Sequence, residues 1–219
     1  GAPNPNLKPE LSENLVARLA WYFEPVGSFT ATVTQNEITN FRIGRAYTPE
    51  EFGVADNPEL AGYTIDSTTN SDELRRMRGL ELGYSQSLAF LPSPFNGLNV
   101  NLAFTRNYSN GRRPGLAPHM VTANVGWGYK RVNLRLGVVS QPDTPWTFTT
   151  NRIRPAVTRY DLSGGFRITN STSFFFTGRN ITNERLLIHD YDPTGTIPEV
   201  LVSSTYNGVN WVFGFKGDF

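Results

Sequence analysis

The feature of this sequence that most restricts its fold is an alternation of apolar and polar residues with a period of two, which recurs along the whole chain. A period of two places successive side chains on opposite faces of a β-strand. Most of these runs reach about ten residues, whereas strands of soluble sheets usually have ~5–6. The segment 71–82, the best helical candidate, fits equally well a charged loop that leads into a strand. The alternating runs predict about nine strands, at residues 15–23, 29–34, 80–90, 98–105, 121–129, 132–138, 159–168, 174–176 and 209–219.

The connections between these runs alternate between short and long. Short ones are expected near Pro25, at 92–97, near Lys130 and near Asn170. Long polar ones are expected at 44–71, 109–118, 141–155 and 183–203. Short turns at one end and long loops at the other are typical of outer-membrane barrels. No internal domain boundary interrupts the pattern, so residues 1–219 are expected to belong to one domain.

Composition excludes several classes of protein. The chain has 219 residues, a formal net charge of +1 and no cysteine, which excludes disulfide scaffolds, thiolate zinc sites and cysteine nucleophiles. Near-neutral charge argues against a nucleic-acid binder. A mean hydropathy of −0.35 and the lack of an apolar run near ~18 residues exclude a transmembrane helix, but strands that alternate remain compatible with a membrane barrel. The first residues show neither an initiator Met nor a signal sequence, so we expect a processed chain or a piece of a longer one.

A soluble β-sandwich binding module would also have one apolar face on each strand. Two features favour a membrane sheet instead. The polar face is rich in Asn, Thr, Ser and Gly and poor in Lys and Glu, and aromatic residues gather at strand ends, as in Trp21–Phe23 and Trp127–Tyr129. Aromatic rings settle at the membrane–water interface. The soluble alternative predicts folding without detergent, whereas the membrane alternative predicts aggregation without it.

Four segments resemble the C-terminal half of TonB-dependent outer-membrane receptors. They are residues 4–10 (NPNLKPE), 21–27 (WYFEPVG), 176–184 (FTGRNITNE) and the closing strand 210–219, which ends on Phe219. The resemblance covers nearly the whole chain. It implies an all-β, antiparallel transmembrane barrel in the bacterial outer membrane.

Barrels of this family have about 22 strands and a plug inside them, which 219 residues cannot supply. We therefore expect residues 1–219 to be about nine C-terminal strands, without the plug, the TonB-box or the signal peptide. If the last strand descends to the periplasm, the first also descends, which places residues 4–10 on the extracellular side. The implied function is TonB-energised uptake of a scarce ligand such as a siderophore, cobalamin or a glycan. A passive porin or a small complete outer-membrane barrel is the alternative.

No residue pattern indicates catalysis, so the chain is not expected to be an enzyme, and neither a cofactor nor a metal is expected. The two histidines, His119 and His189, are expected in loops without partners at metal-ligand spacing. His189 stands beside Asp190, Tyr191 and Asp192. An acidic, solvated extracellular loop explains this group better than a metal site does.

Candidate functional residues fall into three sets, and no ligand motif of the family matches them residue by residue. Those for ligand contact are the aromatic and cationic loop residues Trp146, Arg152, Arg154, His189 and Tyr191. Those expected to face the lumen, where they line the wall or pair with plug carboxylates, are Arg18, Arg135 and Arg159. The barrel-assembly signal implied by the resemblance is Trp211, Phe213, Phe215 and Phe219. The faces of Phe174, Phe175 and Phe176 cannot be assigned, because three consecutive aromatic residues break the alternation.

The resemblance also implies a set of partners. These are outer-membrane lipid, the TonB complex through the missing plug, the barrel-assembly machinery through Phe219, and a small-molecule or oligosaccharide ligand. No nucleic-acid partner is expected.

Overall fold

The chain folds almost entirely into β-strands. The computed structural model describes residues 2–57, 59, 62–147, 151–191 and 199–217. The helix α1 (Pro49–Phe52) and the 3-10 turn η2 (Phe95–Gly97) are both short. The strands are β1 (Leu11–Phe23), β2 (Gly27–Thr39), β3 (Arg42–Tyr47), β4 (Ile65–Asn70), β5 (Arg75–Ser87), β6 (Leu98–Ser109), β7 (His119–Tyr129), β8 (Val132–Gln141), β9 (Thr144–Pro145), β10 (Arg152–Arg154), β11 (Val157–Arg167), β12 (Thr172–Arg179), β13 (Leu186–Asp190), β14 (Val200–Thr205) and β15 (Asn210–Gly217).

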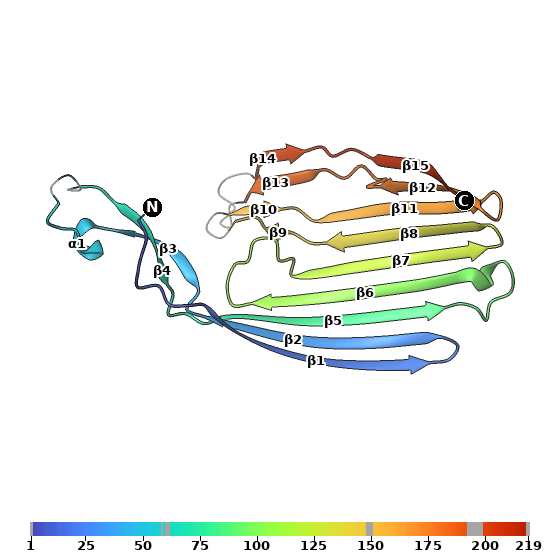
Figure 1. Cartoon of the computed structure of the whole chain (residues 1–219), viewed down its shortest axis with the longest axis horizontal. Helices are drawn as coiled ribbons and strands as arrows, with labels where there is room; N and C mark the ends of the chain where they lie inside the picture. Colours follow the sequence, from blue (N-terminus) through green and yellow to red (C-terminus); the bar gives the residue numbers. More distant parts are fainter. Residues whose placement is uncertain (1, 58, 60–61, 148–150, 192–198, 218–219) are drawn as a thin grey trace. The chain divides into compact units, whose positions relative to one another are not determined.

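Nine of these strands form one sheet in the order β1-β2-β5-β6-β7-β8-β11-β12-β15 (Figure 1). Each strand lies beside the next long strand of the sequence, so the sheet is a meander with β1 and β15 at its edges. The nine strands predicted from the alternation are therefore confirmed. The segment 71–82 contributes to β5 rather than to a helix, and β5 ends at Ser87, before the predicted end at residue 90.

The remaining strands lie in the long connections, where none was predicted. β3 and β4 form a hairpin between β2 and β5. β9, β10, β13 and β14 form a four-stranded sheet in the order β14-β13-β10-β9, which we call the loop sheet. The short connections are residues 24–26, 88–97, 130–131 and 168–171, and the long ones are 40–74, 110–118, 142–156 and 180–209. The predicted alternation of short and long connections is thus present.

The chain divides into two compact units, which are described separately. One unit comprises residues 1–15, 34–78 and 109–111, and the other comprises 16–33, 79–108 and 112–219. The first unit contains the β3–β4 hairpin, and residues 4–10 contact β4 there. Asn4 Nδ2 donates to the Thr68 carbonyl at 2.9 Å, and the Lys8 amide donates to Asn70 Oδ1 at 2.7 Å. The segment with the first resemblance motif therefore lies against the long connection 40–74.

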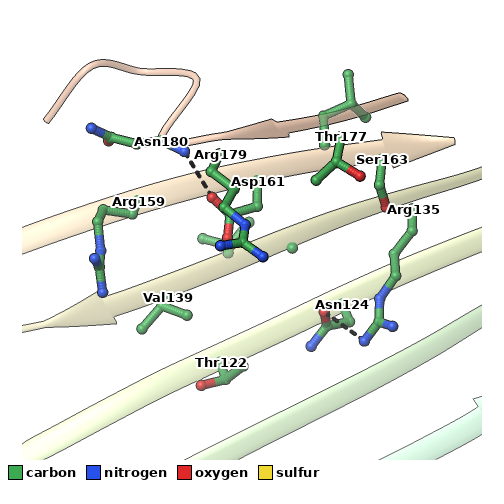
Figure 2. Close-up of a pocket in the computed structure, with 13 residues that line it drawn as sticks. Thr122, Asn124, Arg135, Val139, Arg159, Asp161, Ser163, Thr177, Arg179 and Asn180 are labelled. Atoms are coloured by element: carbon green, nitrogen blue, oxygen red, sulfur yellow. Dashed lines mark hydrogen bonds between the residues drawn. The ribbon is translucent and has the colours of Figure 1, made fainter. Parts of the chain in front are cut away.

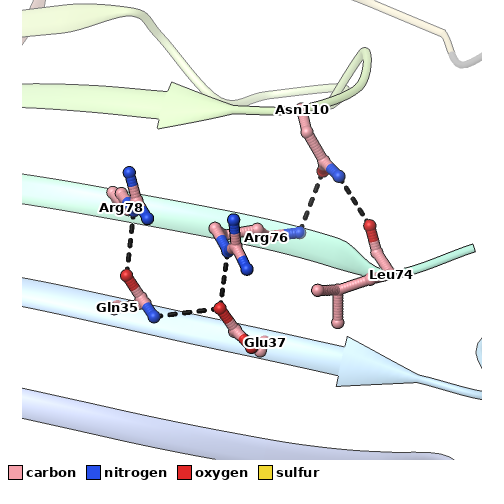
Figure 3. Close-up of polar contacts among 6 residues, drawn as sticks. All are labelled: Gln35, Glu37, Leu74, Arg76, Arg78 and Asn110. Carbon is pink, nitrogen blue, oxygen red and sulfur yellow. Dashed lines mark hydrogen bonds and ion pairs between the residues drawn. The ribbon is translucent and has the colours of Figure 1, made fainter.

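Polar side chains join β2 to β5 within this first unit (Figure 3). Arg76 Nε forms an ion pair with Glu37 Oε1 at 2.5 Å, and Arg78 Nε donates to Gln35 Oε1 at 2.9 Å. Asn110 continues the cluster, because its Oδ1 accepts from the Arg76 amide at 2.9 Å. This end of the two strands thus carries a cluster of polar contacts.

In the second unit, strand register decides which residues share a face. Trp127 lies opposite Leu134, Leu134 opposite Gly164, and Gly164 opposite Phe176. Since directly opposed residues share a face, one face carries the apolar positions of all these strands. Phe174 and Phe176 belong to this face, where they lie opposite Phe215 and Phe213. Phe175 lies opposite Gly214 on the other face, which resolves the orientation that the sequence leaves open.

This apolar face is not covered by any other layer of the described chain. The buried hydrophobic residues are Phe41 and Ala117, and no large side chain within the described ranges is fully buried. Phe215 is 72% exposed and Phe213 is 62% exposed. Large apolar areas of this kind mark an interaction surface. The apolar face therefore requires an external apolar partner.

Aromatic residues gather at the short-turn end of this face. Val132 and Phe166 are directly opposed, as are Phe166 and Phe174, and Phe174 and Phe215. Beside them, the Trp127 and Tyr129 rings stack with centroids 6.1 Å apart. The Trp127 indole N–H also donates to the Pro94 carbonyl of the 88–97 turn at 2.9 Å. An apolar ring with a hydrogen-bonded polar end suits the boundary between membrane and water.

Among the described residues, no helix has the length and the apolar content needed to cross a membrane.

Candidate functional site

A hollow on the polar face of the sheet brings two of the predicted lumen arginines together. Its volume is about 410 Å³, and its lining comes from β7, β8, β11, β12 and Asn180, which follows β12. We call it the arginine hollow. Its polar lining consists of Thr122, Asn124, Arg135, Arg159, Asp161, Ser163, Thr177, Arg179 and Asn180 (Figure 2).

The register of the strands builds this hollow in rows. Asn124 and Asp161 lie on either side of Gly137, which is opposite both of them. One row further toward the short-turn end, Ser163 lies opposite Arg135 and Thr177. One row toward the long loops, Arg159 lies opposite Val139. Because the central position is a glycine, the floor of the hollow carries no side chain.

The charges in the hollow do not neutralise one another. Arg135 Nη2 donates to the neutral amide oxygen of Asn124 at 3.2 Å. Asp161 Oδ1 accepts the backbone N–H of Asn180 at 2.8 Å. Within the described part of the chain, no ion pair involves Arg135, Arg159, Arg179 or Asp161. Three guanidinium groups against one carboxylate give the lining a net positive charge.

The five predicted ligand-contact residues lie together on the loop sheet or at its border. The Trp146 amide donates to the Arg152 carbonyl at 2.9 Å, and the Tyr191 amide donates to the Asn151 carbonyl at 3.1 Å. Arg152 lies opposite Asp190. The two long loops 142–156 and 180–209 are thus one hydrogen-bonded structure.

The loop sheet does not place all five on one face. Arg152 and Arg154 alternate with Ile153, and His189 lies opposite Ile153. Therefore His189 is on the opposite face from the two arginines. The prediction of irregular loop positions is also wrong for both histidines, since His189 lies in β13 and His119 begins β7.

Charged and polar side chains form contacts between strands of the loop sheet at its surface. Arg152 Nε is 3.6 Å from Asp190 Oδ1, which is an ion pair too long for a hydrogen bond. His189 Nδ1 contacts Glu199 Oε1 across the β13–β14 connection. Within the described residues, no group of three or more His, Cys, Asp or Glu side chains is placed to hold a metal. Asp192, which the sequence analysis considered with His189, lies outside the described residues.

Arg154 connects the loop sheet with the arginine hollow. Burial lowers the pKa of the Arg154 guanidinium, and the like charge of Arg159 lowers it further. Arg154 and its neighbours also line a smaller hollow of about 270 Å³ with residues 182–185. One positive residue thus lies at the loop sheet and another, Arg159, lines the arginine hollow.

The structure separates the other predicted residues from this site. Arg18 lies in β1 and does not line the arginine hollow. Trp211, Phe213 and Phe215 lie in β15, and the Trp211 and Phe213 rings stack 5.8 Å apart. Phe219 lies outside the described residues.

Sequence reasoning missed Asp161 and Arg179 as members of the site. Asp161 follows Arg159 by two residues on one strand, so strand periodicity alone was sufficient to place both on one face. Arg179 follows the Phe174–Phe176 run, whose faces the sequence leaves open. Its position needed the register between β11 and β12.

Comparisons with known proteins agree on one family. A family model described as "TonB dependent receptor-like, beta-barrel" matches residues 1–181. A curated relative from Haemophilus influenzae, "Probable hemoglobin and hemoglobin-haptoglobin-binding protein 4", is 27% identical over 140 residues, which cover 62% of this chain and 14% of that protein.

Solved structures share the fold. The copper transporter OprC aligns with a TM-score of 0.66 and 11% identity over 98% of this chain and 32% of its own. A mutant ferric enterobactin receptor, PfeA from Pseudomonas aeruginosa, aligns with a TM-score of 0.59 and 15% identity over 84% of this chain and 27% of its own. The FpvAI–pyocin S2 complex contributes a chain with a TM-score of 0.63 and 15% identity, over 97% of this chain and 28% of that one. The present chain thus spans a third or less of the proteins it matches.

Proposed function

Because the chain belongs to the family of TonB-dependent receptor-like β-barrels, we propose that it is part of an outer-membrane receptor that takes up a scarce ligand with energy supplied through TonB. The family places the chain in the outer membrane of bacteria. The observation that carries the proposal is the division of one nine-stranded sheet into an exposed apolar face and a polar face with a positive hollow. A sheet of this kind separates lipid from an aqueous lumen.

We further propose that residues 1–219 are the C-terminal portion of one barrel domain. The chain spans only a small part of the length of each relative, which supports this proposal. In this proposal a plug outside these residues contacts TonB. Lipid covers the apolar face, and the barrel-assembly machinery recognises the terminal strand with Trp211, Phe213, Phe215 and Phe219.

The loop sheet is the proposed point of first contact with the ligand. Trp146 and Tyr191 are 42% and 48% exposed and offer aromatic surface. Arg152, Arg154 and His189 offer cationic and hydrogen-bonding groups beside them. The long loops would then lie outside the cell, as loops of this length do in outer-membrane barrels. We propose no catalytic role for any residue.

A test of the proposal uses the full-length protein, expressed in a strain that lacks its own copy. Membrane fractionation first measures whether the protein is in the outer membrane. Accumulation of a labelled ferric siderophore, a copper salt and haemoglobin-derived haem is then measured with and without TonB. We expect at least one probe to accumulate only when TonB is present.

Other outcomes support the alternatives. Equal accumulation without TonB would indicate a passive porin and would refute energised uptake. Recovery of folded protein in the soluble fraction would indicate a soluble β-sandwich binding module.

A further inference from the structure

We propose that the arginine hollow binds an oxyanion group, such as a carboxylate or a phosphate, of the ligand that passes through the barrel. This inference rests on the proposed transport function and adds the charge class of the ligand and the place where it binds. The relatives carry names that refer to copper, ferric enterobactin and haemoglobin. These names do not indicate whether the ligand of this chain is an anion or a cation, whereas the charge of the hollow favours an anion.

Unpaired positive charge is the first argument. Arg159 and Arg179 line the hollow, and in the described part of the chain neither forms an ion pair. The carboxylate of Asp161 already accepts the Asn180 amide. Guanidinium groups bind oxyanions through two parallel N–H donors, and charge-assisted bonds of this kind are stronger than neutral ones. The hollow therefore attracts an anion and repels a bare metal cation.

Space for the anion is the second argument. Gly137 lies at the floor, and a Cβ added there would lie 3.2 Å from Asn124 Oδ1. A side chain at this position would press on Asn124 and fill the space between Asn124 and Asp161. The glycine keeps open the floor of a hollow whose lining includes Arg135, Arg159 and Arg179.

Neutral donors around the rim are the third argument. Thr122, Ser163 and Thr177 each add a hydroxyl to the lining. Hydroxyl groups donate to anionic oxygens as readily as to water. Together with the guanidinium groups, they can replace the hydration of a carboxylate or a phosphate.

The position of the hollow is the fourth argument. Arg159 lies near the start of β11, which follows Arg154 of the loop sheet by a short link. The charge of Arg159 acts on Arg154, so the two cations are close enough to influence each other. An anion released from the loop sheet meets a second positive site on its way into the lumen.

The test measures charge at the hollow in the full-length receptor. Ser163→Cys places a thiol opposite Arg135. Its reaction rate with a sulfonate-bearing (anionic) methanethiosulfonate is compared with that of a trimethylammonium (cationic) one, after correction for the parent protein and for free cysteine. Ser85→Cys is the matched control, because Ser85 contacts Asn101 and Asn101 lies opposite Asn124 in the same row of the sheet.

We expect the anionic-to-cationic rate ratio to be about tenfold or more higher at residue 163 than at residue 85. A unit charge ~6 Å away in a water-like medium changes each rate about threefold, in opposite directions for the two reagents. Arg179→Gln should therefore lower the ratio about tenfold. Arg159→Gln, four residues or ~13 Å further along β11, should lower it about threefold. Arg18→Gln, which removes an arginine outside the hollow, should leave it unchanged.

Binding of an anion in the hollow is then measured by how far it protects the cysteine from labelling. Inorganic phosphate and citrate, at constant ionic strength set with chloride, should slow the labelling of Ser163→Cys but not of Ser85→Cys. The double variant R159Q/R179Q should need at least tenfold more of either anion for half protection. Protection by one anion and not the other would identify the preferred oxyanion.

Several outcomes would overturn the inference. Equal rate ratios at the two positions, or a ratio insensitive to both Arg→Gln changes, would show that the hollow has no anion preference. A lack of protection by both anions would show that it binds neither. No labelling of Ser163→Cys by either reagent would show that the rest of the protein fills the hollow. These results do not depend on transport, so they are separate from a failure of TonB-dependent uptake.

Discussion

Replacing Leu136 by lysine should destabilise the protein in a membrane more than the same change at Val132, which lies nearer the short-turn end of β8. The size of this cost in free energy depends on how deep the residue lies in the membrane. Val132 stands in the aromatic row with Phe166, and Leu136 lies four residues further along the strand. At a rise of ~3.3 Å per residue and a tilt of ~40°, this is about 10 Å along the membrane normal. Because the apolar band of such barrels is ~25 Å tall, Leu136 lies close to its middle.

Lysine at the middle of the band costs about 2–4 kcal/mol, and near its edge about 0–1 kcal/mol. Lysine at Leu136 should therefore cost the full amount, at Leu134 an intermediate amount, and at Val132 least. The assay is urea unfolding of the full-length protein refolded in lipid vesicles, followed by tryptophan fluorescence. The midpoint at constant slope reports the free energy of unfolding.

The matched control is Asn133→Lys, which lies on the same strand and on the opposite face. It should change the free energy of unfolding by less than about 0.5 kcal/mol, as surface substitutions usually do. If lysine lowers the free energy of unfolding equally at positions 132, 134 and 136, the depth argument is wrong. If Asn133→Lys costs as much as Leu136→Lys, the assignment of faces is wrong.

Three further changes probe other contacts. Gly164→Ala should lower stability by about 1–3 kcal/mol in the same unfolding assay, because the added Cβ would lie 2.8 Å from the Asn133 carbonyl oxygen; an unchanged midpoint would contradict this. Trp127→Phe removes an indole donor from the short-turn end and should cost about 1 kcal/mol, whereas no cost would mean that water replaces the bond fully. Glu199→Gln weakens the contact with His189, so limited proteolysis should cut the 180–209 loop faster while the free energy of unfolding changes by less than about 1 kcal/mol; unchanged cutting would show that this contact does not hold the loop sheet.

Strand periodicity was sufficient to predict the main sheet, because each long strand has one apolar face. The loop sheet escaped prediction for a physical reason. β9 spans two residues and β10 three, which is too short for any period to emerge. Such strands form because a neighbouring strand pairs with them, so their existence depends on contacts between distant segments.

The arginine hollow was half predictable. Alternation places Arg135 and Arg159 on the polar face of their own strands. It does not tell which residues of neighbouring strands meet, because a shift of register by two preserves every face and changes every neighbour. The proximity of Arg179 to Arg159 is therefore a property of register and required the structure.

The apolar face of this sheet has one further consequence for how the sequence can change. In a soluble core, shortening a side chain leaves a void among closely packed neighbours, and the void adds to the cost. In the proposed barrel the neighbours of Leu136 on one side are fluid acyl chains, which close around any shape. Substitutions such as Leu136→Val or Leu136→Ala should thus lose only the free energy of transfer of the removed atoms from water to lipid. Side chains on this face should therefore vary in size from one related sequence to another, while they stay apolar. The opposite face follows the reverse rule, since a methyl group at Gly137 would obstruct the hollow that the arginines surround.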